Sequence, residues 1–196
     1  QDTAAIYQEI QDAPERLAWQ GTKLRALGMD RLKSLIKTGG RSLYAPQEEA
    51  AAKLLAANTT ESLATLLRRY PLAQAADDAA IALANQALGR NDGAEAVLVL
   101  SAALEDNAQR PRRGEMCALL ALGHARTGEK LRARLVAART LREFPDGKLK
   151  RGEGEVTFKE LLGPLAAAGG TGRAGNALPR MAGQPAELWR RDWELG

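Results

Sequence analysis

Small and apolar residues follow the same spacing in two stretches of the chain, one around Ala96 and one around Ala133, 37 positions later (133 − 96 = 37). In each stretch three matched residues stand 13, 12 and 9 positions before the alanine: Leu83, Ala84 and Ala87 in the first, and Leu120, Ala121 and His124 in the second. A fixed period of this length is the signature of stacked helical hairpins. We therefore predict two hairpins, built from helices over 74–89 and 93–106, and over 114–127 and 129–144.

Three short helices are predicted before residue 40, over 3–13, 15–27 and 31–37. Gly28 should end the second helix, because glycine is the residue most often found just beyond a helix. Asp30 is expected to cap the third helix, and Gly39-Gly40 to end it.

Two further helices precede the hairpins. The first covers 46–57 and starts with a proline, which suits the first turn of a helix. Asn58 followed by Glu61 has the spacing of a capping box, so the second helix is predicted over 60–70. Pro71 should end it, because proline lacks the amide donor that a helix needs.

The composition changes after Pro145. Residues 146–155 are charged and interrupted by glycine, and one short helix is predicted over 156–162. Residues 163–185 are rich in glycine and proline and cannot bury enough apolar surface to order themselves, which predicts an irregular linker.

The expected fold class is all-α: an array of helical hairpin repeats followed by an irregular C-terminal tail rich in glycine and proline. Hydrophobic residues make up 45% of the chain but aromatic residues only 4%, so alanine and leucine must fill a thin core of closely packed helices. We divide the chain into N-terminal helices (1–45), helical hairpins (46–145), a charged and Gly/Pro-rich linker (146–185) and a tryptophan-containing anchor segment (186–196).

Charge and cysteine content exclude several classes of protein. The net charge of +4 permits an acidic partner without requiring one. The single cysteine, Cys117, rules out an intrachain disulfide and a paired-cysteine zinc site. No apolar run approaches the ~18 residues that a membrane-spanning helix needs, so no transmembrane segment is expected.

The sequence contains no recognisable catalytic constellation, so we expect no enzyme, no cofactor and no metal. His124 has no second metal ligand at a suitable spacing and is expected to pack as a helix residue. Cys117 is expected to act as a small buried apolar residue. The short basic cluster at Arg110, Arg112 and Arg113 is a candidate for contact with phosphates or an anionic surface, although solvated loop charge is the simpler interpretation.

The segment 186–196 is unusual for the end of a chain. Trp189 and Trp193 stand four positions apart beside Leu188, so they share one face whether the segment is helical or extended. Exposed tryptophans commonly anchor interfaces. We therefore expect this segment to dock, either on the helices of this chain or on a partner.

The stretch 82–100 resembles a tetratricopeptide repeat. In that family small residues fill the close contacts between the two helices of a repeat, which here implies this role for Ala84, Ala96 and Ala103, and for Ala121 and Ala133 in the second unit. Pro145 falls at the closing proline of the family. The chain departs from the pattern where Ala87 and His124 replace the usual aromatic residue, where Thr140 replaces the small residue, and where Ala108 replaces a closing proline.

The order of parts along the whole chain is similar to the helical region that precedes the β-propeller in large bacterial proteins with PQQ-like repeats. The likeness rests on the Tyr70-Pro71 and Phe144-Pro145 endings and on the LWRRDWELG segment, and it implies a periplasmic or secreted bacterial protein. The chain begins at Gln1-Asp2, the kind of end that cleavage of a secretory signal leaves and that trimming leaves equally well. A cytoplasmic location is the alternative.

From these patterns we expect a non-enzymatic scaffold or assembly subunit that binds a protein partner, rather than a small molecule, through the helical groove or the tail. Trp189, Trp193, Leu188, Arg110, Arg112 and Arg113 are its candidate contact residues. One alternative is a module that binds nucleic acid or an anionic surface through the loop arginines, with nucleic acid the less expected. Another is an accessory domain of a larger propeller protein.

Overall fold

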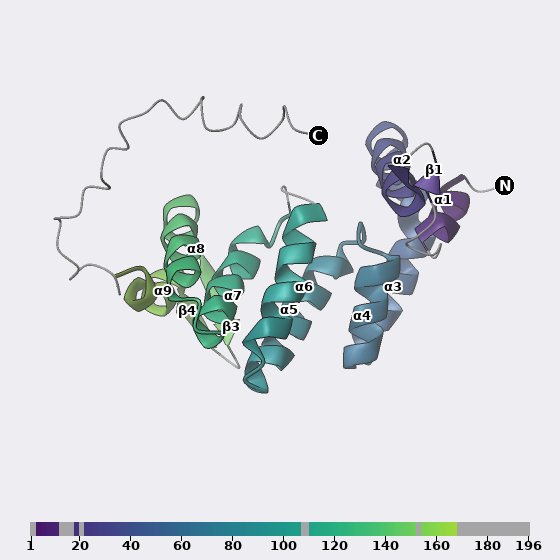
Figure 1. The fold of residues 1–196 in the computed structure, drawn as a ribbon. Helices are drawn as coiled ribbons and strands as arrows, with labels where there is room; N and C mark the ends of the chain where they lie inside the picture. Colours follow the sequence, from purple (N-terminus) through teal and green to yellow (C-terminus); the bar gives the residue numbers. More distant parts are fainter. Residues whose placement is uncertain (1–2, 12–17, 20–21, 107–109, 152–153, 168–196) are drawn as a thin grey trace, which may run out of the picture.

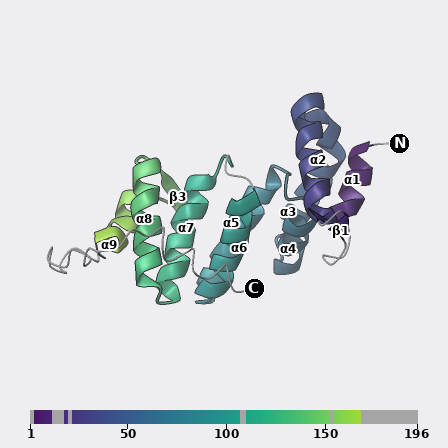
Figure 2. The same ribbon diagram turned by 45° about the horizontal axis from the view of Figure 1, so that its top comes forward.

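The computed structural model describes residues 3–11, 18–19, 22–106, 110–151 and 154–167. These residues are mostly helical, in agreement with the predicted all-α character, and two short antiparallel hairpins of strands accompany the helices. Helices α3 to α8 stand side by side in an elongated row, with α1 and α2 at one end and α9 at the other (Figures 1 and 2).

Most predicted helices are present close to their expected bounds. The N-terminal part contains α1 (Thr3–Gln11), β1 (Ala18–Trp19), β2 (Thr22–Lys23), α2 (Leu24–Gly39), the 3-10 helix η1 (Arg41–Tyr44), α3 (Ala45–Ala57) and α4 (Thr60–Arg69). The remainder contains α5 (Ala75–Gly89), α6 (Gly93–Asp106), α7 (Arg113–Arg126), α8 (Lys130–Glu143), β3 (Lys148–Arg151), β4 (Gly154–Thr157) and α9 (Phe158–Ala167).

The prediction of two helices over 15–27 and 31–37 is wrong. β1 and β2 pair as a small antiparallel hairpin, and α2 then runs without a break through Gly28 and Asp30. A glycine inside a helix costs only about 1 kcal/mol, so it ends a helix only where no tertiary contact outweighs that cost. Here Leu32 is buried and Gly28 is enclosed within α2, which packs against α1.

The N-cap of α4 lies one residue later than predicted, although α3 ends and α4 begins where expected. Asn58 adopts a left-handed conformation (φ 48°) and closes α3, so it cannot also cap α4. Thr59 is the cap: its Oγ1 accepts from the Ser62 amide at 3.1 Å, and Ser62 Oγ accepts from the Thr59 amide at 3.0 Å. The capping box therefore exists, with Ser62 rather than Glu61 as its second member.

The two central hairpins, α5–α6 and α7–α8, have turns that share one hydrogen-bonding pattern. The Asn91 amide donates to Leu88 O at 3.1 Å, and the Gly128 amide, 37 residues later (128 − 91 = 37), donates to Ala125 O at 3.2 Å. Asn91 and Gly128 both have positive φ angles, 63° and 80°. The left-handed residue of the first turn is thus Asn91, so Gly93 is not needed for turn geometry.

The ends of α4 and α8 also match, at twice that period. The Tyr70 amide donates to Leu66 O at 2.7 Å, and the Phe144 amide, 74 residues later (144 − 70 = 74), donates to Thr140 O at 2.8 Å. In both places the next residue is a proline, which cannot continue the helix. The aromatic-proline pairs therefore mark equivalent helix ends.

Small residues lie where neighbouring helices approach most closely. Ala96 and Ala133 are buried as expected, at 0% and 2% exposure. At the crossing of α6 and α7, a Cβ on Gly93 would lie 2.7 Å from the carbonyl oxygen of Gly123, and a Cβ on Gly123 would lie 2.9 Å from Val97 Cγ2. The role of Gly93 is therefore in packing between helices rather than in the turn.

Residues 148–151 and 154–167 have more regular secondary structure than predicted. β3 and β4 form an antiparallel hairpin where an irregular charged stretch was expected, and the predicted helix over 156–162 begins two residues late and continues to Ala167. Phe158 is fully buried against Gly147, and its amide donates to Gly147 O at 2.8 Å. The linker prediction is therefore wrong for 163–167, and the remainder of the linker lies outside the described residues.

The close approach of α6 and α7 at Gly93 and Gly123 can be tested by adding a methyl group at Gly93. Gly93→Ala should lower the free energy of unfolding by roughly 1–3 kcal/mol, because the new Cβ meets backbone that cannot rotate away. Gly89→Ala is the matched control: its Cβ would meet nothing within 4 Å, so it should stabilise α5 by about 0.5–1 kcal/mol. Urea titrations measure both, and equal effects of the two variants would contradict the close approach.

Candidate functional site

The loop that precedes α7 contains a buried ion pair. Arg110 Nη1 donates to Asp77 Oδ1 on α5, and the two side chains are only 3% and 9% exposed. Arg110 Nη2 also donates to Pro71 O at 3.3 Å, at the turn that follows α4. One guanidinium therefore joins the end of α4, the start of α5 and the loop between α6 and α7.

Arg112 extends this network across the surface. Its guanidinium pairs with Asp78 and forms two hydrogen bonds to Glu115, at 2.7 and 2.6 Å. Its backbone amide donates to Asp77 Oδ2 at 3.3 Å. The Glu115 carboxylate in particular raises the pKa of Arg112 above its usual range, so this side chain remains charged.

The interpretation of the loop arginines as solvated charge is wrong for Arg110 and holds only in part for Arg112. Arg110 is buried, and Arg112 is half-buried with two carboxylate partners. Arg113 is the first residue of α7 and forms no ion pair with any residue in the described ranges. The structure thus brings Arg110 and Arg112 together and leaves Arg113 apart from them.

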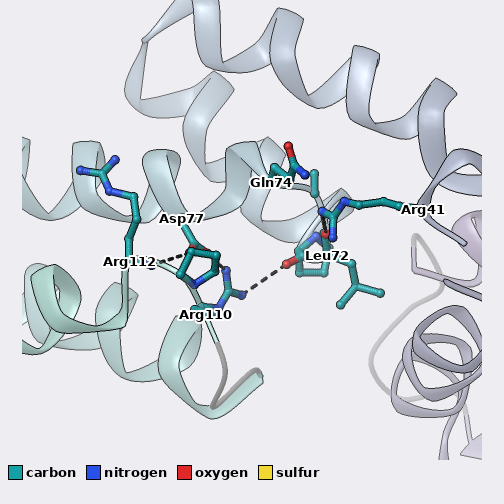
Figure 3. Close-up of a pocket in the computed structure, with 9 residues that line it drawn as sticks. Arg41, Leu72, Gln74, Asp77, Arg110 and Arg112 are labelled. Carbon is teal, nitrogen blue, oxygen red and sulfur yellow. Dashed lines mark hydrogen bonds and ion pairs between the residues drawn. The ribbon is translucent and has the colours of Figure 1, made fainter. Parts of the chain in front are cut away.

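A hollow of about 320 Å³ lies beside these arginines (Figure 3). Arg41, from η1, completes a set of three guanidinium groups on its wall, and its Nη2 donates to Leu72 O at 2.9 Å. Arg41 is also paired with Glu48, at 2.6 Å. Every guanidinium in the hollow is therefore already matched by a carboxylate, so the cluster braces the loops and offers little free positive charge to a ligand.

A second and more apolar hollow, of about 420 Å³, lies between α4 and α6 with α5 beneath it. We call it the α4–α6 groove. Leu98 stands at the groove with 72% of its surface exposed, the largest exposure given for any large apolar residue in the described ranges. Its lining is mostly apolar: Ala64, Leu67, Arg68, Pro71, Leu83, Leu98, Val99, Ala102, Ala103 and Arg110. Such a surface can accept apolar side chains of another molecule.

His124 lies at the end of α7 with 7% exposure, which matches the expected packing role. Its Nδ1 lies 2.5 Å from Glu129 Oε2, so a carboxylate partner does stand nearby, five residues along the chain. The hydrogen bond from His124 is the main cause of a lowered pKa of Glu129. One histidine and one carboxylate are too few to hold a metal ion.

Cys117 is half-buried on α7, and burial raises the pKa of its thiol, which disfavours the reactive thiolate.

Across the residues that the structure describes, no group of three histidine, cysteine or carboxylate side chains is placed to bind a metal ion. Within the same residues, no helix has both the length and the apolar character needed to cross a membrane.

Leu188, Trp189 and Trp193 lie outside the described residues, so their docking stays a prediction.

The sequence patterns did not predict the acidic partners of the arginine network, which are Asp77, Asp78 and Glu115. Asp77 and Asp78 lie in the first turn of a predicted helix, where acidic residues are common and favourable. They therefore gave no specific signal of a distant arginine.

Comparisons of the chain with protein-family models, with curated proteins and with solved structures find no match.

The buried ion pair gives a clear expectation for stability. Arg110→Met should lower the free energy of unfolding by about 3 kcal/mol or more, because Asp77 is left buried without its partner. The double variant Asp77→Leu/Arg110→Met should recover most of that loss, since no uncompensated charge remains. Thermal or urea unfolding of the single and double variants measures this coupling, and an Arg110→Met protein as stable as the parent would contradict it.

Arg113→Met, at the first residue of α7, is the control and should change stability by less than about 0.5 kcal/mol, because Arg113 forms no ion pair with a described residue.

Proposed function

We propose that this protein is a non-enzymatic scaffold, built as an array of helical hairpin repeats, that binds a protein partner at the α4–α6 groove. The repeat is supported by the matching turns at Asn91 and Gly128 and by the matching helix ends at Tyr70 and Phe144, which are 37 and 74 residues apart. Stacked hairpins of this kind present long continuous surfaces and depend only on contacts between neighbours.

The exposure of Leu98 is the observation on which the proposed binding site rests. Leu98 lies on α6 with 72% exposure, while the opposite side of the same helix buries Ala96 and Leu100 completely. The groove beside it is lined mainly by aliphatic groups from three successive helices. An apolar side chain of a partner can therefore bury Leu98 together with the groove, and apolar burial is the main favourable contribution to such association.

The loop-arginine alternative has less support than the scaffold. A phosphate that binds Arg110 must compete with Asp77, and one that binds Arg112 must compete with Asp78 and Glu115. A role as an accessory domain of a larger propeller protein, and a periplasmic or secreted location, stay predictions that follow from the resemblance.

The groove can be tested with matched double variants in a capture experiment. Leu98→Gln/Ala102→Gln makes the groove polar at two exposed positions of α6, whereas the control Leu131→Gln/Leu135→Gln changes two exposed leucines of α8. The groove variant should lose a partner at least about tenfold, because two apolar contacts are removed from the centre of the interface. Quantitative mass spectrometry of proteins captured by the parent and both variants from the native source measures the loss.

The control variant should retain the same partner. The groove proposal fails if every protein captured by the parent is recovered equally with the groove variant. All three proteins should show the same circular dichroism and melting temperature, because the altered side chains are exposed.

The tail gives an independent prediction. Trp189→Ala/Trp193→Ala should release the partner or undock the tail, because two indoles supply much of the apolar surface of the anchor segment. Partner capture and protection of the tail from protease measure this, and the circular dichroism of the helices should stay unchanged. Unaltered capture together with unaltered protection would contradict the anchor role.

A further inference from the structure

Helix α8 is far more basic than α6, which is the second helix of the previous hairpin. α8 contains five cations and one carboxylate within its bounds, a net charge of +4 (5 − 1 = 4): Lys130, Arg132, Arg134, Arg139 and Arg142 against Glu143. α6, which occupies the same place in the previous hairpin, contains no lysine or arginine. The positive charge is therefore a property of one helix and not of the repeated pattern.

The side of α8 that faces away from the core carries a stripe of leucine. Leu131 and Leu135 are 63% and 57% exposed, and residues four apart lie on the same face of a helix. Ala138 is exposed on this face as well. The opposite face carries Ala133, Ala137 and Thr140, which are all buried, so the orientation of the leucines follows from the packing of the helix.

Cations lie along both edges of the leucine stripe. The helical repeat places Lys130 and Arg134 on one edge and Arg132 and Arg139 on the other. Arg132 pairs with Glu129 and Arg139 with Glu143, at 2.8 and 2.6 Å. Lys130 and Arg134 form no ion pair with any residue that the structure describes. Part of the positive charge at the stripe is thus not neutralised by the residues that the structure describes.

A ligand for this face must offer apolar contact and negative charge together. Nucleic acid presents phosphates but gives exposed leucines nothing to bury against. An anionic bilayer presents a layer of phosphate directly above hydrocarbon, so leucines can enter the acyl boundary while arginines on both sides reach the headgroups. We propose that the outer face of α8 docks on an anionic phospholipid membrane, with the helix axis in the plane of the interface.

The position of α8 in the molecule is compatible with this contact. α8 lies between α7 and α9 in the row of helices (Figures 1 and 2). Leu131 and Leu135 remain exposed despite both neighbours. The face is distinct from the α4–α6 groove, which is formed by α4, α5 and α6. A protein partner and a membrane can therefore be bound by different helices, so either proposal can fail without the other.

Co-sedimentation of the full chain with vesicles tests the docking. Vesicles of phosphatidylcholine containing about 30% phosphatidylserine should bind the chain at about 0.15 M salt, and vesicles of phosphatidylcholine alone should bind it at least about tenfold more weakly. Leu131→Gln/Leu135→Gln should weaken binding about tenfold, because apolar insertion is lost. Lys130→Gln/Arg134→Gln/Arg142→Gln should weaken it about a hundredfold, because each cation near an anionic leaflet contributes about a fivefold gain.

Two control variants separate the α8 face from general properties of the chain. Leu98→Gln/Ala102→Gln removes apolar surface from the outer face of α6, a helix without lysine or arginine, and should leave vesicle binding unchanged. Arg31→Gln/Lys37→Gln/Lys53→Gln removes the same number of charges from exposed positions of α2 and α3 and should weaken binding less than threefold, through net charge alone. All substituted side chains are exposed or half-buried, and circular dichroism checks the fold of each variant.

Three results would overturn the proposal. The first is no preference for phosphatidylserine vesicles over neutral ones. The second is loss of binding in the cation variant while the leucine variant binds fully, which indicates adsorption to any polyanion. The third is an equal loss in the α8 and the α2–α3 charge variants, which indicates attraction by net charge without a site.

Discussion

Close approach between neighbouring helix backbones is the constraint on which this structure depends. At the crossing of α6 and α7, Gly93 and Gly123 leave no space for a side chain between the two main chains. Alanines take the equivalent inward positions along α6 and α8, where Ala96 and Ala133 are almost completely buried. These contacts admit only small groups at Ala133 and Ala137 of α8, and Leu131 and Leu135 lie on the outer face of the same helix.

A core made largely of alanine buries little apolar area per residue, so polar contacts take a larger part in defining how the helices are joined. The pair of Arg110 and Asp77 does this at the loops, where it links the end of α4, the start of α5 and the approach to α7. A buried ion pair adds little net stability, yet separating its two partners leaves a buried charge unpaired, which is costly. Arrangements of the loops that keep Arg110 and Asp77 together are therefore favoured over those that separate them.

The same packing leaves two outer faces with different chemistry. Leu98 on α6 and Leu135 on α8 occupy equivalent positions, 37 residues apart (135 − 98 = 37), and both are exposed. Around Leu98 the helix has no cation, and an apolar groove lies beside it. Around Leu135 the helix carries five cations. One packing of helices can therefore present an apolar surface suited to a protein and a basic, leucine-bearing surface suited to an anionic membrane.

The sequence by itself determined the helices of the central hairpins and the burial of Ala96 and Ala133, because helical period, turn residues and prolines act through neighbours along the chain. Only the tertiary structure decided the features that depend on distant residues. Gly28 stays inside α2 because packing outweighs its poor helix propensity, and α9 forms because Phe158 is buried against the turn at Gly147. Arg110 became a brace because Asp77, 33 residues away, meets it inside the fold. A local pattern of charge shows neither that distant partner nor the burial that makes the pair important.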